Sequence, residues 1–241
     1  SAEHKLNERL TVRYGLRLAI FQNMGSATVY KYDNNYEVSD STRYGSGKIY
    51  HTYYRLEPRV GMVYKLSESS SIKANYARNT QFIQIANNSS SGSPLDLWFP
   101  ASPNIKPQTA DMVSAGYFKN FNNNAFEFST EIYYKKMDHV IDFADHATLL
   151  LNDKLEGEVR TGTGKAYGIE FMLKKNTGKL TGFINYTLSR SERTIPEINE
   201  GKTYLSPFDK THSTNISTSY ELSKKWSISA AWVYADRKSV V

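Results

Sequence analysis

The sequence predicts an all-β fold, an antiparallel up-and-down meander of about nine strands whose apolar face meets lipid as in a transmembrane β-barrel. Three observations predict it. Apolar and polar residues alternate with a period of two in nine segments, which is the pattern of strands with one apolar and one polar face. Short and long connections between the segments alternate strictly, and aromatic residues lie near both ends of the segments.

The segment 179–190 shows the alternation, because Leu180, Ile184 and Leu188 share one face while Thr181 and Asn185 fall on the other. The same period recurs along the chain. The expected strands, with one residue of the apolar face in parentheses where the alternation is clearest, are 8–21 (Leu16), 53–65 (Leu56), 71–82 (Ile72), 110–119, 125–136 (Ile132), 166–175 (Ile169), 179–190 (Ile184), 211–221 (Ile216) and 226–235 (Ile228).

The connections indicate a membrane setting. Outer-membrane barrels have short turns at one end and long loops at the other, whereas a soluble sandwich has no reason to keep that order over nine strands. The short polar turns are 66–70, 120–124, 176–179 and 222–225, and the long polar connections are 22–52, 83–109, 137–165 and 191–210.

Aromatic residues flank the short turns, as Tyr64 and Trp226 do, and others such as Tyr54 and Tyr134 lie near the opposite strand ends. Two aromatic girdles are typical of a barrel, although aromatic residues also favour strands in general. The polar face is expected to line the lumen. Its charged residues include Arg13, Arg17, Arg55, Arg59, Lys73, Glu127, Glu131 and Glu170.

Composition excludes several function classes. The 241 residues carry a formal charge of +6 without a basic block, which argues against nucleic-acid binding. Cysteine is absent, so no thiolate metal site or nucleophile is possible. There is no run of 18 apolar residues, so the sequence predicts no transmembrane helix. The acidic and histidine cluster 138–146 matches no closed zinc motif and is expected in a long loop. No catalytic constellation, resident metal or cofactor is predicted.

Several stretches together resemble the barrel of TonB-dependent outer-membrane receptors of the Bacteroidetes type. These are AYGIE (166–170), the strand from Gly182 through Tyr186 and Thr187 to Ser189, and PFDKTH (207–212). In the first half, 57–82 and 104–120 resemble family strands as well. The resemblance covers nearly the whole chain, because the order and spacing of these loose motifs agree.

The resemblance implies that 1–241 is part of a barrel, with about nine of the roughly 22 strands of the family barrel. The plug domain and the C-terminal strands would be absent from it. The full-length protein would lie in the outer membrane of a Gram-negative bacterium, in contact with its lipid. It would import a scarce small-molecule or oligomeric nutrient, such as an iron chelate, cobalamin or a glycan. TonB, acting on segments outside this chain, would supply the energy, and no bond of the nutrient would be broken.

The resemblance also implies that the long connections form part of the ligand surface. Candidate ligand contacts are Tyr30, Tyr32, Tyr36, Trp98 and Phe99, since rigid aromatic rings bind at low entropic cost. The alternative is that these rings pack loop against loop. The lumen arginines could steer an anionic ferric chelate. Alternatively they pair with lumen carboxylates or with the plug, and this pairing is favoured for most of them.

Other functions remain open. A passive outer-membrane porin would have the same barrel pattern without a plug. A soluble all-β adhesin or carbohydrate-binding module would stay in solution without detergent and would show no heat-modifiable migration on gels. A hydrolase on a β scaffold would have to use Glu127 and Glu131, for which the sequence indicates no pocket.

Overall fold

The structure, a computed structural model, describes residues 1–86, 97–149 and 151–236. Its main feature is one antiparallel sheet of eleven strands, in which β13 (Tyr204–Leu205) pairs with β12 beside the main path. The main path runs through β1 (Ala2–Lys5), β2 (Leu10–Met24), β5 (Ile49–Ser67), β6 (Ser70–Gln81), β9 (Gln108–Phe121), β10 (Phe126–Phe143), β11 (Val159–Lys175), β12 (Leu180–Thr194), β14 (His212–Ser223) and β15 (Trp226–Ala235).

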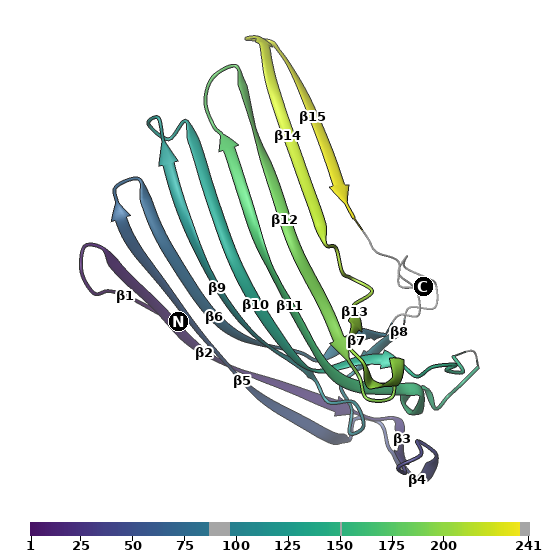
Figure 1. The fold of residues 1–241 in the computed structure, drawn as a ribbon. Coiled ribbons are helices and arrows are strands. Elements are labelled where there is room, and N and C mark those ends of the chain that lie inside the picture. The colour runs from purple at the N-terminus through teal and green to yellow at the C-terminus, as the bar shows by residue number, and fades with distance from the viewer. Residues whose placement is uncertain (87–96, 150, 237–241) are drawn as a thin grey trace.

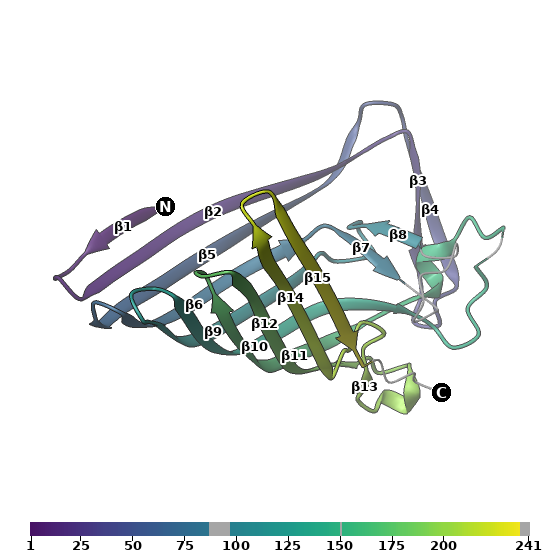
Figure 2. The ribbon, with the colours of Figure 1, turned by 90° about the horizontal axis from the view of Figure 1, so that it is seen from above.

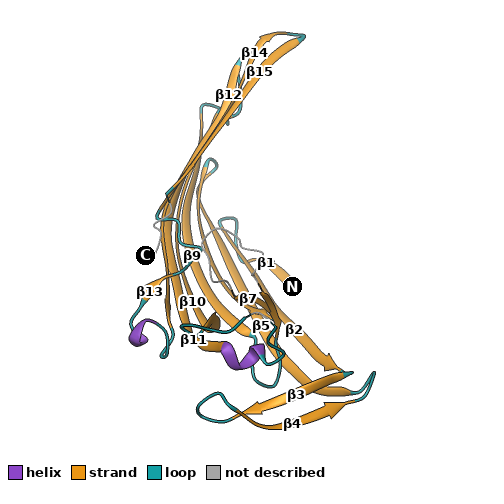
Figure 3. Ribbon diagram, turned by 90° about the vertical axis from the view of Figure 1, so that its right-hand side faces the viewer, coloured by secondary structure: helices purple, strands orange, loops and turns teal. Residues whose placement is uncertain are grey.

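All nine predicted strands are present and follow one another in chain order, so the predicted meander is confirmed. The short turns gather at one end of the sheet and the long connections at the other (Figure 1). Among the described residues β1 and β15 do not pair with each other, and the sheet is an open curved wall (Figure 3). No helix among these residues is long and apolar enough to cross a membrane.

One face of the wall is apolar and exposed. The register places Ile132 of β10 between Ala115 of β9 and Ile169 of β11, and similar rows cross the sheet because side chains of one parity share a face. Many large residues of this face are exposed, including Leu16, Leu56 and Ile132. An uncovered apolar surface of this extent needs a partner, and lipid is the partner of the outer face of a barrel.

The polar face is the concave side of the wall, and chain from a long connection lies over it (Figure 2). The Asn23 side-chain amide donates to the Ala101 carbonyl at 2.8 Å, and the Tyr53 hydroxyl donates to the Ser102 carbonyl at 2.6 Å. The hairpin of β7 (Ile83–Ala86) and β8 (Leu97–Pro100) therefore lies inside the curve of the wall (Figure 2).

The long polar connections contain regular structure that the alternation in the sequence does not indicate. The first contains a hairpin of β3 (Ala27–Tyr32) and β4 (Val38–Tyr44), and the second contains β7 and β8. Short 3-10 turns, η1 (Leu155–Glu158) and η2 (Asn199–Gly201), lie in the other two. Hairpins can form there because each pairs its own backbone groups locally.

β10 and β11 run further into the third connection than predicted. Asp138 pairs with Thr163 and Val140 pairs with Gly162, so His139 is an extra, unpaired residue with φ of 61°. Such a bulge interrupts the alternation on which the prediction depended. The cluster 138–146, expected in a loop, is therefore strand as far as Phe143.

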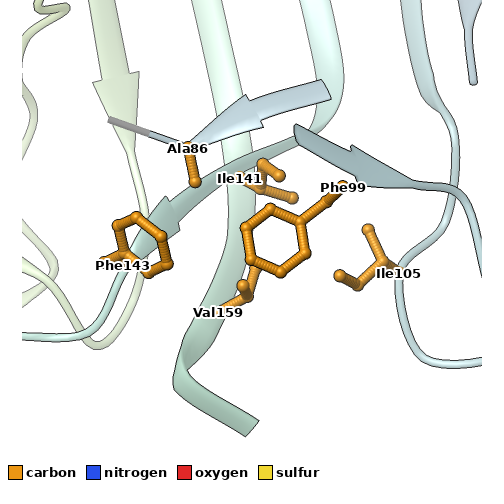
Figure 4. Close-up of a cluster of buried hydrophobic side chains, with 6 residues drawn as sticks. All are labelled: Ala86, Phe99, Ile105, Ile141, Phe143 and Val159. Carbon is orange, nitrogen blue, oxygen red and sulfur yellow. The ribbon is translucent and has the colours of Figure 1, made fainter. Parts of the chain in front are cut away.

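The buried apolar core lies at the long-connection end of the wall. Figure 4 shows side chains from β7, β8, β10 and β11 converging there with Ile105. The members of this cluster are Ala86, Phe99, Ile105, Ile141, Phe143 and Val159. Burying these side chains fixes the β7–β8 hairpin against the strands, and this holds the polar groups nearby in place.

Candidate functional site

The concave face carries charged side chains that pair with one another near the first strands. The Arg17 guanidinium lies 3.2 Å from the Glu57 carboxylate, whose side chain is only 3% exposed. The backbone N–H of Thr80 donates to the same carboxylate at 2.9 Å. Arg13 pairs with Glu3 of β1 at 2.6 Å. The buried Glu57 is thus satisfied by a base and an amide, which fits a structural role.

The carboxylates of β10 and β11 are arranged differently. Glu131 stands directly opposite Glu170 in the register of the two strands, on the concave face. Glu127 accepts a hydrogen bond from the Asn176 side chain at 2.6 Å, and the Lys174 ammonium lies 4.0 Å away. Arg55 lies with its guanidinium 5.2 Å from the centre of the Tyr53 ring, an arrangement in which the ring attracts the cation.

A polar pocket of about 250 Å³ opens on the concave face at the long-connection end. Strands β9 to β12 form its wall, and residues of β7 and of the 206–208 segment close over it. Its polar lining residues are Gln81, Gln84, Gln108, Lys135, Ser191, Arg193 and Ser206. It contains two cations and no carboxylate among its described lining residues, so it suits a ligand that is anionic or rich in acceptor oxygens.

Arg193 is held in the pocket wall by a buried network. Its guanidinium lies 3.0 Å from the Asp142 carboxylate and donates to the Ile141 carbonyl at 3.2 Å. The Tyr204 hydroxyl donates to the same Asp142 carboxylate at 2.9 Å. Burial raises the pKa of Tyr204 well above its ordinary value, and the adjacent Asp142 charge adds to this. The network fixes β13 and the end of β12 against β10.

The β3–β4 hairpin is docked on the third and fourth long connections. The Tyr36 hydroxyl donates to the Glu197 carboxylate at 2.6 Å, and Arg160 lies 2.5 Å from that carboxylate. The Arg160 guanidinium also lies 3.4 Å from the centre of the Tyr36 ring. Burial and then the hydrogen bond to Glu197 raise the pKa of Tyr36. This cluster of three side chains joins three connections far apart in the sequence.

The family model described as TonB dependent receptor-like, beta-barrel matches residues 1–240. The chain belongs to this family of TonB-dependent receptor barrels. The predicted family is therefore confirmed, and its Bacteroidetes type stays a prediction. No curated protein matches the chain.

Solved structures of import and outer-membrane receptors have the same fold over nearly all of this chain. The alcaligin outer-membrane receptor FauA of Bordetella pertussis aligns with a TM-score of 0.61 and 14% identity, over 98% of this chain and 36% of that one. The ferric-catecholate import receptor Fiu of E. coli K12 aligns with a TM-score of 0.62 and 16% identity, over 97% and 33%. The ferripyoverdine receptor of Pseudomonas aeruginosa aligns with a TM-score of 0.58 and 14% identity, over 95% and 26%. The chain thus spans about a third of such receptors.

In this receptor barrel the five aromatic candidates for ligand contact differ in their surroundings. Tyr30 and Tyr32 reach the third connection, since their hydroxyls lie 3.3 Å from the Asp153 carboxylate and the Lys154 carbonyl. Phe99 is 6% exposed and packs edge-on against Phe143, with ring centres 5.8 Å apart. A ligand cannot reach most of Phe99.

Trp98, next to Phe99 on β8, is 66% exposed. It is the freest of the five aromatic rings for stacking on a ligand, because Tyr30, Tyr32 and Tyr36 already contact other connections. Ligand contact by any of them stays a prediction.

The sequence did not indicate most of the residues that build the receptor's pocket and docked loops. These are Lys135, Arg160, Arg193, Glu197 and Tyr204. Asp142 belongs to the cluster 138–146, which the sequence indicated only as part of a long loop. One signal was present: Lys135 has the same parity as Glu127 and Glu131 on one predicted strand, which places it on the polar face. The others lie beyond the predicted strands, where alternation gives no guidance.

Proposed function

We propose that this chain is part of the barrel wall of an outer-membrane receptor that takes up a scarce nutrient with energy from TonB. The family match and the uncovered apolar face support this proposal. The remaining strands and the plug domain would belong to the same full-length chain, since the described sheet is an open wall. The receptor would face lipid in a Gram-negative outer membrane, and it would move its nutrient without breaking a bond.

Among the nutrients that this barrel type suits, an anionic iron chelate is the one we favour. The observation that carries this choice is the concave pocket, whose described lining residues include Lys135 and Arg193 and no carboxylate. Lys135 is the cation available to the chelate, since Arg193 is already paired with Asp142. Charge-assisted hydrogen bonds from such cations are about twice as strong as neutral ones. A neutral glycan would gain less from this group.

Energised uptake distinguishes the receptor from a passive porin. We expect a strain that lacks the full-length receptor to lose uptake of one labelled ferric chelate and to regain it when the gene is restored. In the strain that carries the receptor, deletion of TonB should abolish uptake, because a plugged barrel opens only when TonB acts on the plug. Uptake that continues at the same rate without TonB would support the porin and contradict the receptor.

Lys135→Gln in the full-length receptor should weaken binding of the anionic chelate by about tenfold or more, since a hydrogen bond to a charged group contributes about 1.5–3 kcal/mol. The matched control is Lys73→Gln. Lys73 lies on the same concave face near the short-turn end, over the Phe118 ring at 4.0 Å. The affinities are measured by titration of the purified receptor. Equal affinities of both variants and the wild type would show that Lys135 does not bind the chelate.

A further inference from the structure

A row of charged residues crosses the outer face just beyond its aromatic residues. Arg78 of β6 is opposite Asp111 of β9, and Asp111 is opposite Lys136 of β10. The row continues to Lys165 of β11 and Glu192 of β12. We call these five residues, with Arg190 two positions before Glu192, the outer charged row. No local sequence motif indicates it, because each strand contributes only one or two members.

The outer charged row follows directly on the aromatic band. Two positions nearer the short turns, the register aligns Tyr76, Val113, Tyr134 and Tyr167. Phe126 to Lys136 on β10 covers ten residue steps, which is about 25 Å along the membrane normal for a strand tilted by about 40°. That length equals the height of the apolar band of a barrel. The row therefore stands at the level of the lipid headgroups on the long-loop side.

The exposed charge of the row is basic, although its acids and bases pair. Arg78 binds Asp111 through two nitrogens, at 2.9 and 2.8 Å. Lys165 lies 3.0 Å from Glu192, and Arg190 contacts the same carboxylate. The four cation side chains are 44–60% exposed, whereas the carboxylates beside them, Asp111, Asp138 and Glu192, are 27%, 39% and 10% exposed. The acids hold the bases in place from beneath, and the bases face outward.

Each cation keeps donors for a further acceptor. Arg78 uses Nε and Nη2 for Asp111, which leaves Nη1 free of that pair. The Lys136 ammonium is 3.6 Å from the Asp138 carboxylate, beyond a good hydrogen bond. All these strands have a neighbour on both sides, so closing the barrel would not cover their outer faces. Phosphate oxygens are suited to such a spaced line of guanidinium and ammonium groups.

We propose that Arg78, Lys136, Lys165 and Arg190 bind the phosphate groups of phosphorylated lipids in the outer leaflet. The proposal rests on the proposed function, because it takes the long connections as extracellular. The row anchors the barrel at a fixed depth in the membrane, and the lipid phosphates cover the basic residues. A protein partner is less suited to this place, since the row is continuous with the lipid-facing apolar surface.

The test uses the purified full-length receptor, titrated in neutral detergent with a glycolipid that carries two phosphates. Binding is measured by native mass spectrometry. The double variant Lys136→Gln with Lys165→Gln should weaken binding roughly 25-fold, at about fivefold for each basic residue near an anionic lipid surface. The wild type should bind the dephosphorylated glycolipid as weakly as the variant binds the phosphorylated one.

The matched control is Lys119→Gln with Lys175→Gln. These lysines have the outward parity on β9 and β11 but lie at the short-turn end, and the control should change affinity less than twofold. Equal weakening by both pairs, undiminished binding of the dephosphorylated lipid, or displacement of the glycolipid by inorganic phosphate at equal concentration would each overturn the proposal. Chelate uptake by the wild type is scored separately, so a failed uptake assay would count against the proposed function alone.

Discussion

Ile132→Lys should destabilise the full-length receptor in lipid vesicles by about 2–4 kcal/mol, because a lysine on the lipid face near the middle of the membrane must leave water for hydrocarbon. Ile132 is exposed on the outer face of β10, with Ala115 and Ile169 as its neighbours in the register. The free energy of unfolding is measured by urea titration, with heat-modifiable gel migration as the marker of the folded barrel.

Ser129→Lys on the same strand is the control for Ile132→Lys. Ser129 has the opposite parity and lies with Glu131 and Glu170 around a depression on the concave face, so a cation there meets two carboxylates. We expect its effect to stay within about 0.5 kcal/mol. If Ile132→Lys were as mild as Ser129→Lys, the apolar face would be covered by something other than lipid. A soluble all-β module would then explain the alternation better.

The strands could be predicted because alternation is a local property. Between Phe126 and Lys136 every second residue of β10 faces the same side, so its existence and its two faces follow from the sequence. The alternation fails at His139, because this one extra residue reverses which of the following residues face each side of the sheet. Beyond this bulge Val140 and Ile141 are both buried, and burial on two sides has no period-two signal.

The pocket and the docked loops could not be predicted, because their parts are distant in sequence. Lys135 could be assigned to the polar face from its parity, but Arg193 lies beyond the predicted end of its strand. Tyr36 and Glu197 meet only because the first and fourth connections fold over the same end of the wall. The sequence indicates the aromatic residues of the long connections as binding candidates. It does not indicate that Phe99 is buried while its neighbour Trp98 is exposed.

Asp142→Ala should destabilise the rim of the barrel by about 3–5 kcal/mol, because it leaves the Arg193 charge without its partner in a site where both side chains are 12% exposed. The Tyr204 hydroxyl loses its acceptor at the same time, and burial makes that loss costly. We expect faster amide hydrogen exchange in β13 and at the end of β12, measured by mass spectrometry on the full-length receptor.

Asp40→Ala is the comparison for Asp142→Ala, because it also removes one carboxylate from an ion pair. The Lys31–Asp40 pair has a similar separation of 2.9 Å, but its side chains are 66% and 57% exposed. Water and ions screen such a pair, so the loss should be much smaller than that of Asp142→Ala. Equal exchange rates in β13 of both variants would mean that the rim is held by the apolar cluster around Phe143 alone. The position of Arg193 in the pocket would then not depend on Asp142, and chelate affinity would be the same in both variants.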